Sequence, residues 1–242
     1  MSFLTQAIKL EHALTLLETQ SISVLENYWR KLREEKSNSN KKLISNSNIS
    51  NAMHLTRELF LSGKSHPKLE KLKEIVSDHL SKDPDSRIIV FANYRESVKE
   101  IVKTLKNVEN ARPVEFVGQK QGMTQKEQIK RLTLFKKGEY NILVGTSISE
   151  EGLDIVSSKL AIFFEPVASP LRSIQRRGRV GRTSPGKIIV LITRGTRDEA
   201  YHWASFRKEK RMKGIVFGMK KEGSYNRKNV SVKQKDLRNF AV

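Results

Sequence analysis

The sequence predicts an α/β protein, with a mostly parallel sheet flanked by helices and an N-terminal helical segment before it. From Arg87 onward, short runs of β-branched residues alternate with amphipathic stretches, a pattern typical of a parallel sheet buried on both faces. Before Arg87, apolar residues recur at helical spacing. The expected organisation is a helical segment at 1–85, an α/β unit at 86–212 and a basic tail at 213–242.

The N-terminal segment is expected to contain several helices. Residues 1–36 carry apolar residues three or four apart, and a short helix is expected near 51–62. The strongest begins at Pro67, because proline is favoured at the first position of a helix. Residues 37–50 are rich in serine, asparagine and lysine, which predicts an exposed polar loop.

Five apolar runs are expected to form the strands: Ile88–Ala92, Val114–Val117, Asn141–Gly145, Leu160–Phe164 and Lys187–Thr193. Helices are expected between and after them, near 95–107, 124–137, 169–180 and 196–212. Two of these helices open with a capping box, a threonine followed three residues later by a glutamate: Thr124 with Glu127, and Thr196 with Glu199.

Composition narrows the class of partner. The chain has 46 lysines and arginines against 26 acids, a net charge of +20, which favours nucleic acid over acidic lipid. No apolar run approaches the ~20 residues that cross a bilayer, and the N-terminus lacks a signal-peptide pattern. We therefore expect an intracellular, cytoplasmic protein without a membrane partner, associated with the nucleoid if prokaryotic. Without cysteine, and with five scattered histidines, the sequence predicts no metal site.

The C-terminal region holds much of the excess charge. Twelve bases and three acids lie between Arg207 and Arg238. Two interpretations stay open, a solvated disordered tail and a tail that binds nucleic acid.

Four arginines and two glycines lie in the eight residues from Gln175 to Arg182, with no acid among them. In a helix, Gln175, Arg179 and Arg182 share one face, and Gly178 and Gly181 leave an adjacent face without side chains. Arginine matches phosphate oxygens bidentately, so this face suits a polyphosphate. A plain solvated helix is the simpler interpretation, but each glycine would cost it about 0.5–1 kcal/mol.

Polar residues also follow two of the expected strands. Asn93, Tyr94 and Arg95 come directly after the first, and the segment Gly145–Asp154 follows the third with hydroxyls, Gly152 and Asp154. Ligands of open α/β sheets bind at the carboxyl ends of strands. An ordinary strand-to-helix turn would explain Gly145–Asp154 alone, but the arginine cluster about twenty residues later favours a ligand site.

Together these motifs resemble the second RecA-like lobe of a superfamily 2 helicase of the Hef/FANCM/Mph1 group, and the N-terminal segment is similar to part of that group's helical insertion. The resemblance covers about residues 5–212. It is carried by residues 16–20, 66–73, 145–154, 164–167, 173–182 and 195–201.

This resemblance implies an ATP-dependent DNA translocase that acts on branched or fork DNA in repair. Carried over by motif position, Arg179 and Arg182 are the catalytic residues, with Arg182 the arginine finger. The expected nucleotide-binding residues are Gln175, Gly152 and Asp154. The expected DNA-binding residues are Thr146, Asn93, Tyr94, Arg95, Gly118 and Gln119.

The sequence departs from a complete ATPase. Residues 58–65 end in Gly63-Lys64-Ser65, as a P-loop does. However, Glu58 occupies the position of the first glycine of that motif, and a helical pattern rather than a strand precedes it. Asp198-Glu199-Ala200-Tyr201 imitates an acidic Mg²⁺ box but lies at a helix start. We reject both. ATP and Mg²⁺ are therefore expected to be held mainly by a P-loop lobe that this chain lacks.

Two functions remain. The first is half of a helicase, inactive alone, whose P-loop lobe is a separate polypeptide or was lost by truncation. The alternative is a non-catalytic DNA-binding or regulatory module that retains the RecA-like fold. The intact stripe of Gln175, Arg179 and Arg182 favours the first, because a module without catalysis does not need glycines inside a helix.

Overall fold

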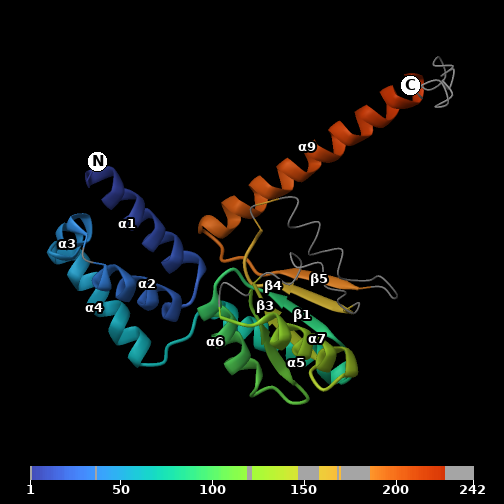
Figure 1. The fold of residues 1–242 in the computed structure, drawn as a ribbon, viewed down its shortest axis with the longest axis horizontal. Coiled ribbons are helices and arrows are strands. Elements are labelled where there is room, and N and C mark those ends of the chain that lie inside the picture. Colours follow the sequence, from blue (N-terminus) through green and yellow to red (C-terminus); the bar gives the residue numbers. More distant parts are fainter. Residues whose placement is uncertain are drawn as a thin grey trace, which may run out of the picture.

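The protein forms a five-stranded parallel sheet with a group of helices beside it (Figure 1). The computed structural model describes residues 2–35, 37–118, 122–146, 158–167, 169 and 186–226; for residues 2 and 216–226 it describes the backbone alone. Among these residues, the sheet order is β2-β3-β1-β4-β5 and every pairing is parallel.

Within the described residues the strands and helices alternate as the sequence predicts, and the helix predicted near 169–180 lies outside those residues. The strands are β1 (Ile88–Phe91), β2 (Pro113–Phe116), β3 (Ile142–Gly145), β4 (Leu160–Phe163) and β5 (Lys187–Val190). The helices of this part are α5 (Pro67–Lys82), α6 (Arg95–Leu105), α7 (Gln125–Lys137) and α9 (Arg197–Asn226). The predicted fold class is therefore confirmed.

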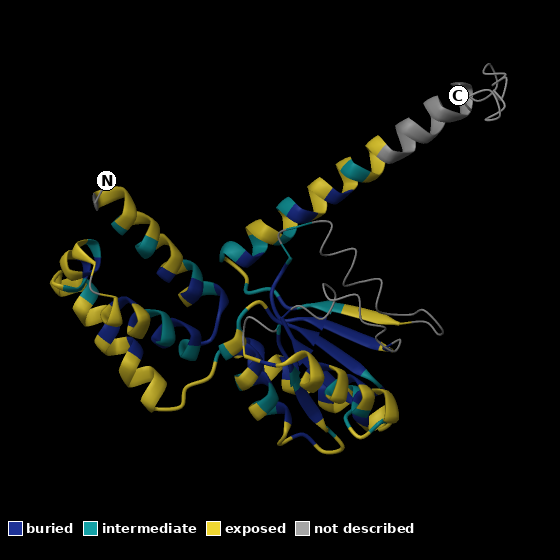
Figure 2. Cartoon of the chain, viewed as in Figure 1, coloured by how far each residue is buried: buried dark blue, intermediate teal, exposed yellow. Residues whose placement is uncertain are grey.

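Side-chain alternation divides the core between the two faces of the sheet. In β1, Ile88 and Val90 belong to the cluster that includes α5 and α6. Ile89 and Phe91 belong to a second cluster, which includes Leu132 and Phe135 of α7. All four residues of β1 are fully buried, which explains the continuous apolar run in the sequence (Figure 2).

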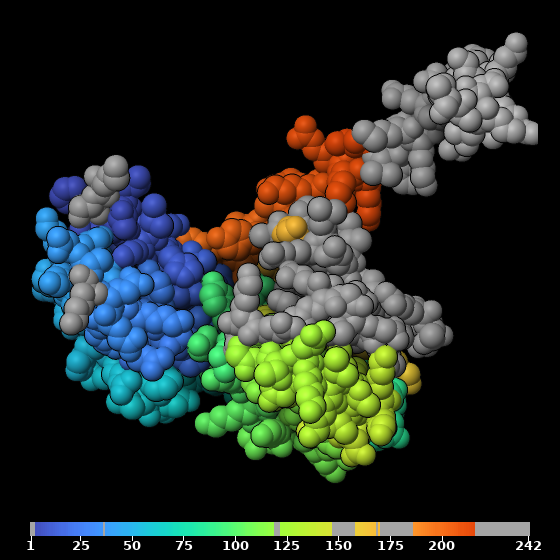
Figure 3. Space-filling view, viewed as in Figure 1, coloured from blue at the N-terminus to red at the C-terminus, as the bar shows by residue number. Residues whose placement is uncertain are grey.

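Helix α5 belongs to the core of the sheet. Its residues Leu69, Leu72, Val76 and Leu80 are at most 1% exposed and pack in the same cluster as the strands. The helical group beside the sheet therefore consists of α1 (Ser2–Thr19), α2 (Ile22–Glu34), α3 (Asn38–Ile44) and α4 (Ser47–Leu61), which lie together in blue and cyan in Figure 3.

The polar loop predicted at 37–50 is wrong, because this segment forms α3 and the start of α4. Ser37 and Asn46 cap the two helices by accepting hydrogen bonds from backbone N–H groups. Asn40 is fully buried, and its amide donates to the carbonyl of Leu32 at 3.0 Å. Leu43 packs in the core of the helical group, so tertiary contacts decide the fold of a segment whose composition suggests a loop.

The capping box at the start of α7 is confirmed: Thr124 accepts from the backbone N–H of Glu127, and the Glu127 carboxylate accepts from that of Thr124. At α9 the pattern differs, because the Glu199 carboxylate accepts from the N–H of Gly195. Helix α9 also continues to Asn226, although the sequence predicts its end near 212.

A candidate nucleic-acid interface at the sheet edge

The carboxyl ends of the strands lie at one edge of the sheet, because all pairings are parallel and the last residues are in register. Phe91 of β1 pairs with Gly145 of β3 and Phe163 of β4, and Phe116 of β2 pairs with Gly145. The residues that follow these strands therefore lie along the same edge.

Five of the six predicted DNA-binding residues lie at this edge. Asn93, Tyr94 and Arg95 follow β1, Gly118 follows β2, and Thr146 follows β3. The sixth, Gln119, lies outside the described residues, as do Gly152, Asp154, Gln175, Arg179 and Arg182. The structure thus brings together one predicted set and does not describe the other.

Arg95 stands exposed at the first position of α6. A cation at a helix N-terminus adds to the partial positive charge of the free N–H groups, an arrangement that an anion relieves. Gly122, at φ 98°, faces the guanidinium, and a Cβ there would lie 3.4 Å from Nη1 of Arg95. No carboxylate of the described residues forms an ion pair with Arg95. This end of α6 is therefore suited to a phosphate group.

Asn93 and Tyr94 link the end of β1 to Glu165, which follows β4. The backbone N–H of Asn93 donates to Oε2 of Glu165 at 3.1 Å, and Glu165 is only 3% exposed. Burial, followed by the charge of Glu165 and the nearby Tyr201, raises the pKa of Tyr94. Its phenol is therefore a neutral hydrogen-bond donor at pH 7. The exposed Asn93 side chain also lies free to contact a ligand at this edge.

Thr146 is 5% exposed, and its N–H donates to the carbonyl of Phe116 at 3.3 Å. A ligand can reach its side chain only if neighbouring groups move.

A groove of about 410 Å³ lies between this edge and the helical group. Asn93, Tyr94 and Glu165 line it from the sheet, residues of α1 line it from the helical group, and Tyr201 of α9 lines it as well. A nucleic-acid strand that follows this edge would therefore also contact α1 and the base of α9.

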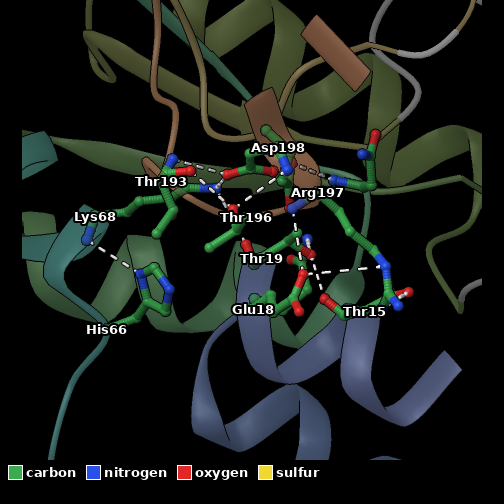
Figure 4. A network of polar contacts seen from close by, with 12 residues as sticks. Thr15, Glu18, Thr19, His66, Lys68, Thr193, Thr196, Arg197 and Asp198 are labelled. Carbon is green, nitrogen blue, oxygen red and sulfur yellow. Dashed lines mark hydrogen bonds and ion pairs between the residues drawn. The ribbon is translucent and has the colours of Figure 1, made fainter. Parts of the chain in front are cut away.

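A buried polar network holds this junction together (Figure 4). Lys68 of α5 and Asp198 of α9 form an ion pair, and they are 5% and 1% exposed. Lys68 also donates to the carbonyl of Thr19 at 3.1 Å, and Asp198 accepts from the N–H of Thr193 at 3.1 Å. His66 caps α5, and its Nδ1 accepts from the N–H of Lys68.

Arg197 extends the network to α1. Its guanidinium lies 2.8 Å from the Glu11 carboxylate and donates to the Thr15 hydroxyl at 2.9 Å. The backbone N–H of Arg197 donates to the Glu18 carboxylate at 3.2 Å. These contacts join the base of α9 to the helical group across 179 to 186 residues of sequence, which local patterns cannot reveal.

The structure places both rejected motifs outside the settings that a metal box or a P-loop requires. Asp198 is engaged by Lys68 in the first turn of a helix rather than placed behind a strand for a metal. Gly63, Lys64 and Ser65 follow α4, a helix, and not a strand. Across the part of the chain that the structure describes, no three histidine, aspartate or glutamate side chains gather as a metal site. Nor is any described helix long and apolar enough to cross a membrane.

Each of the two parts of the chain, the helical group and the sheet, matches a known family of protein domains. Residues 67–184 match the model of the helicase conserved C-terminal domain, and residues 1–59 match that of the helical bundle of ATP-dependent RNA helicases. The first match begins at α5, the helix that packs into the sheet.

Similar curated proteins are helicases. A Methanocaldococcus jannaschii protein named as an ATP-dependent RNA helicase is 44% identical over 219 residues, which are 89% of this chain and 28% of that protein. The ATP-dependent DNA helicase mph1 of Aspergillus niger is 41% identical over 63% of this chain and 15% of its own length. FANCM of Arabidopsis thaliana is 42% identical over 61% of this chain and 12% of its own length. The chain thus spans less than a third of these relatives.

Among solved structures, the helicase domain of Pyrococcus furiosus Hef matches with a TM-score of 0.65 and 46% identity. The match covers 83% of this chain and 42% of that one.

Proposed function

Since this chain is the C-terminal RecA-like lobe, with a helical bundle, of a helicase of the Hef, FANCM and Mph1 group, we propose that it forms half of an ATP-dependent DNA translocase. It supplies DNA-backbone contacts and arginine fingers to a P-loop lobe. The substrate we propose is branched or fork DNA in repair.

The observation that carries the DNA contact is the sheet edge. Asn93, Tyr94 and Arg95 stand there with Gly118 and Thr146, on strands whose carboxyl ends are in register. Exposed Arg95 at the N-terminus of α6 provides positive charge to a phosphate, and the net charge of +20 supports a polyanionic ligand.

The proposed part in ATP hydrolysis rests on residues of the sequence motif. Arg182 and Arg179 contact the γ-phosphate, where guanidinium groups stabilise the charge that develops during transfer. Gln175 binds the same nucleotide, and Gly152 and Asp154 lie near its ribose. The P-loop lobe holds most of the ATP and the Mg²⁺, which supplies a further positive charge to the phosphates.

The test is DNA-stimulated ATP turnover. The chain alone should hydrolyse no ATP, and adding the P-loop lobe of a close relative should restore turnover. Arg182→Ala should then lower it by roughly 10³-fold or more, because fingers are worth about 10³–10⁵ in rate. Arg30→Ala, on the exposed face of α2, is the matched control and should leave turnover unchanged.

The same experiment decides between the two functions. ATP turnover by the chain alone contradicts the division of labour between lobes. DNA binding without turnover, unaffected by Arg182→Ala in the presence of the P-loop lobe, favours a non-catalytic DNA-binding module. Competition between fork-shaped and linear duplex DNA for the chain tests the preferred substrate.

A further inference from the structure

Helix α9 carries two exposed aromatic rings beside exposed cations. Trp203 and Phe206 are 53% and 55% exposed, and Arg207 and Lys210 are exposed as well. The four residues stand at i, i+3, i+4 and i+7, so they share one face of the helix. We call this face the aromatic–basic stripe.

The two rings of the stripe contact each other, and about half of the surface of each residue stays exposed. Their centroids lie 6.1 Å apart, and the ring planes meet at 87°, edge to face. Single exposed apolar residues are common on protein surfaces, whereas two adjoining aromatic rings form a patch that indicates a binding surface.

The charge on the C-terminal side of the rings is almost entirely positive. Five bases lie between positions 207 and 213, and all of them are exposed. The one acid in this stretch, Glu209, is 7% exposed and pairs with Lys213 at 2.9 Å. The solvent-facing side of this part of α9 therefore attracts a polyanion more strongly than it attracts a neutral protein surface.

The stripe lies where a nucleic-acid strand bound at the sheet edge would continue. Helix α9 starts at the carboxyl edge and projects away from the sheet (Figure 1). Phe206 also borders an apolar groove of about 310 Å³, whose opposite wall includes Val167, Ile188 and Val190. A flat apolar ligand stacked on Phe206 thus gains a second apolar wall.

We propose that the aromatic–basic stripe binds an unpaired nucleic-acid strand. Bases stack on Trp203 and Phe206, and Arg207 and Lys210 contact the phosphates between them. Stacking on aromatic side chains tolerates any base, and nearby cations follow the backbone, which is how proteins hold single strands without sequence preference. The inference rests on the proposed function for its DNA substrate and adds a contact surface beyond Asn93, Tyr94 and Arg95.

The two tryptophans of the chain make stacking directly measurable. Trp29 is 4% exposed and its indole N–H donates to Thr56, so it is shielded from added DNA. Titration of a 20-nucleotide oligo(dT) into the full chain should quench Trp203 emission and protect it from acrylamide. Trp29→Phe should retain that quenching, and Trp203→Ala should remove it.

Binding affinity is measured in parallel by the anisotropy of the same oligonucleotide carrying a fluorescent label. Trp203→Ala and Phe206→Ala should each weaken binding about tenfold, since a stacked base contributes about 1–3 kcal/mol. Both positions are exposed, so the variants should keep the circular dichroism of the parent chain.

A charge-matched pair of double variants separates specific contact from general attraction. Arg207→Ala with Lys210→Ala removes two cations from the stripe, and Lys208→Ala with Arg211→Ala removes two from the adjoining face. The first pair should weaken binding more than the second and lower the salt slope by about 2, one for each lost phosphate contact. Equal losses for both pairs overturn the inference in favour of non-specific charge.

Other outcomes separate this inference from the proposed function. If Arg95→Ala weakens oligo(dT) binding while Trp203→Ala and Phe206→Ala leave it unchanged, the stripe is no strand site and the proposed function stands. If the stripe variants instead abolish capture of the P-loop lobe without altering oligo(dT) affinity, the stripe is a protein-docking surface and the inference fails. No binding of oligo(dT) by the chain overturns the inference, while binding of fork-shaped DNA and the ATP-turnover assay still test the proposed function.

Discussion

Replacing Asp198 with asparagine tests the buried network that joins α5, α9 and the helical group. The change keeps the size of the side chain but leaves the Lys68 ammonium, 5% exposed, without its counter-charge. Removing one partner of a buried ion pair costs about 3–5 kcal/mol. The Phe164 ring, 5.6 Å from the Lys68 ammonium, offsets part of this through a cation–π contact, so we expect a loss near ~3 kcal/mol.

The assays are urea unfolding, which gives the free energy, and thermal unfolding, which gives the midpoint temperature, both monitored by circular dichroism. A loss of ~3 kcal/mol in the free energy of unfolding should lower the midpoint temperature by roughly 6–12 °C, because a chain of this size loses about 2–4 °C per kcal/mol. The matched control is Asp78→Asn on the exposed face of α5, which should change stability by less than about 0.5 kcal/mol.

Adding Lys68→Met to Asp198→Asn should recover much of the loss, because an apolar side chain of similar size replaces the unpaired charge. If Asp198→Asn alone costs less than about 1 kcal/mol at an unchanged urea slope, the reasoning from burial is refuted. Such a result would mean that water reaches Lys68 in the folded chain.

Two further predictions concern the same junction. Arg197→Ala removes the contacts with Glu11 and Thr15 of α1; because the arginine is 24% exposed, we expect a loss of only about 1 kcal/mol, together with faster amide exchange in α1. Exchange in α1 as slow as in the Arg30→Ala control would contradict this. For His66, burial and then the charge of Lys68 lower the pKa in the folded chain, so the unfolded chain binds the proton more readily. The contribution of neutral His66 to the free energy of unfolding is therefore complete above about pH 6.5, and it is lost as the pH falls through the lowered folded pKa. His66→Asn keeps a helix cap and should flatten the fall in stability between pH 7 and 5; an unchanged slope would exclude His66 as its source.

The sheet could be predicted from local patterns because each strand is buried on both faces. Runs such as Ile88–Ala92 are apolar at every position, and only a doubly covered parallel strand requires this. The starts of α5 and α7 also followed from local chemistry, since Pro67 and the Thr124–Glu127 capping box act within the first turn of each helix.

The predicted DNA-binding set came from motif resemblance, and the parallel register brings its five described members to one edge. Their function stays a prediction, as do the roles of Gln175, Arg179 and Arg182. Residues 37–50 show where composition gives the wrong secondary structure. Their polar composition predicts a loop, but the helical group buries both Asn40 and Leu43 of α3. A loop-like composition does not exclude a helix whose polar groups find partners in other elements.

The sequence by itself determined the class of fold, the order of its strands along the chain and the net positive charge, because periodicity, helix caps and charge are local properties. Only the tertiary structure decided the order β2-β3-β1-β4-β5, the place of α5 within the sheet core, and the pairing of Lys68 with Asp198. The physical reason is that a buried charge is stable only beside its counter-charge, and folding alone brings together two residues so distant in sequence.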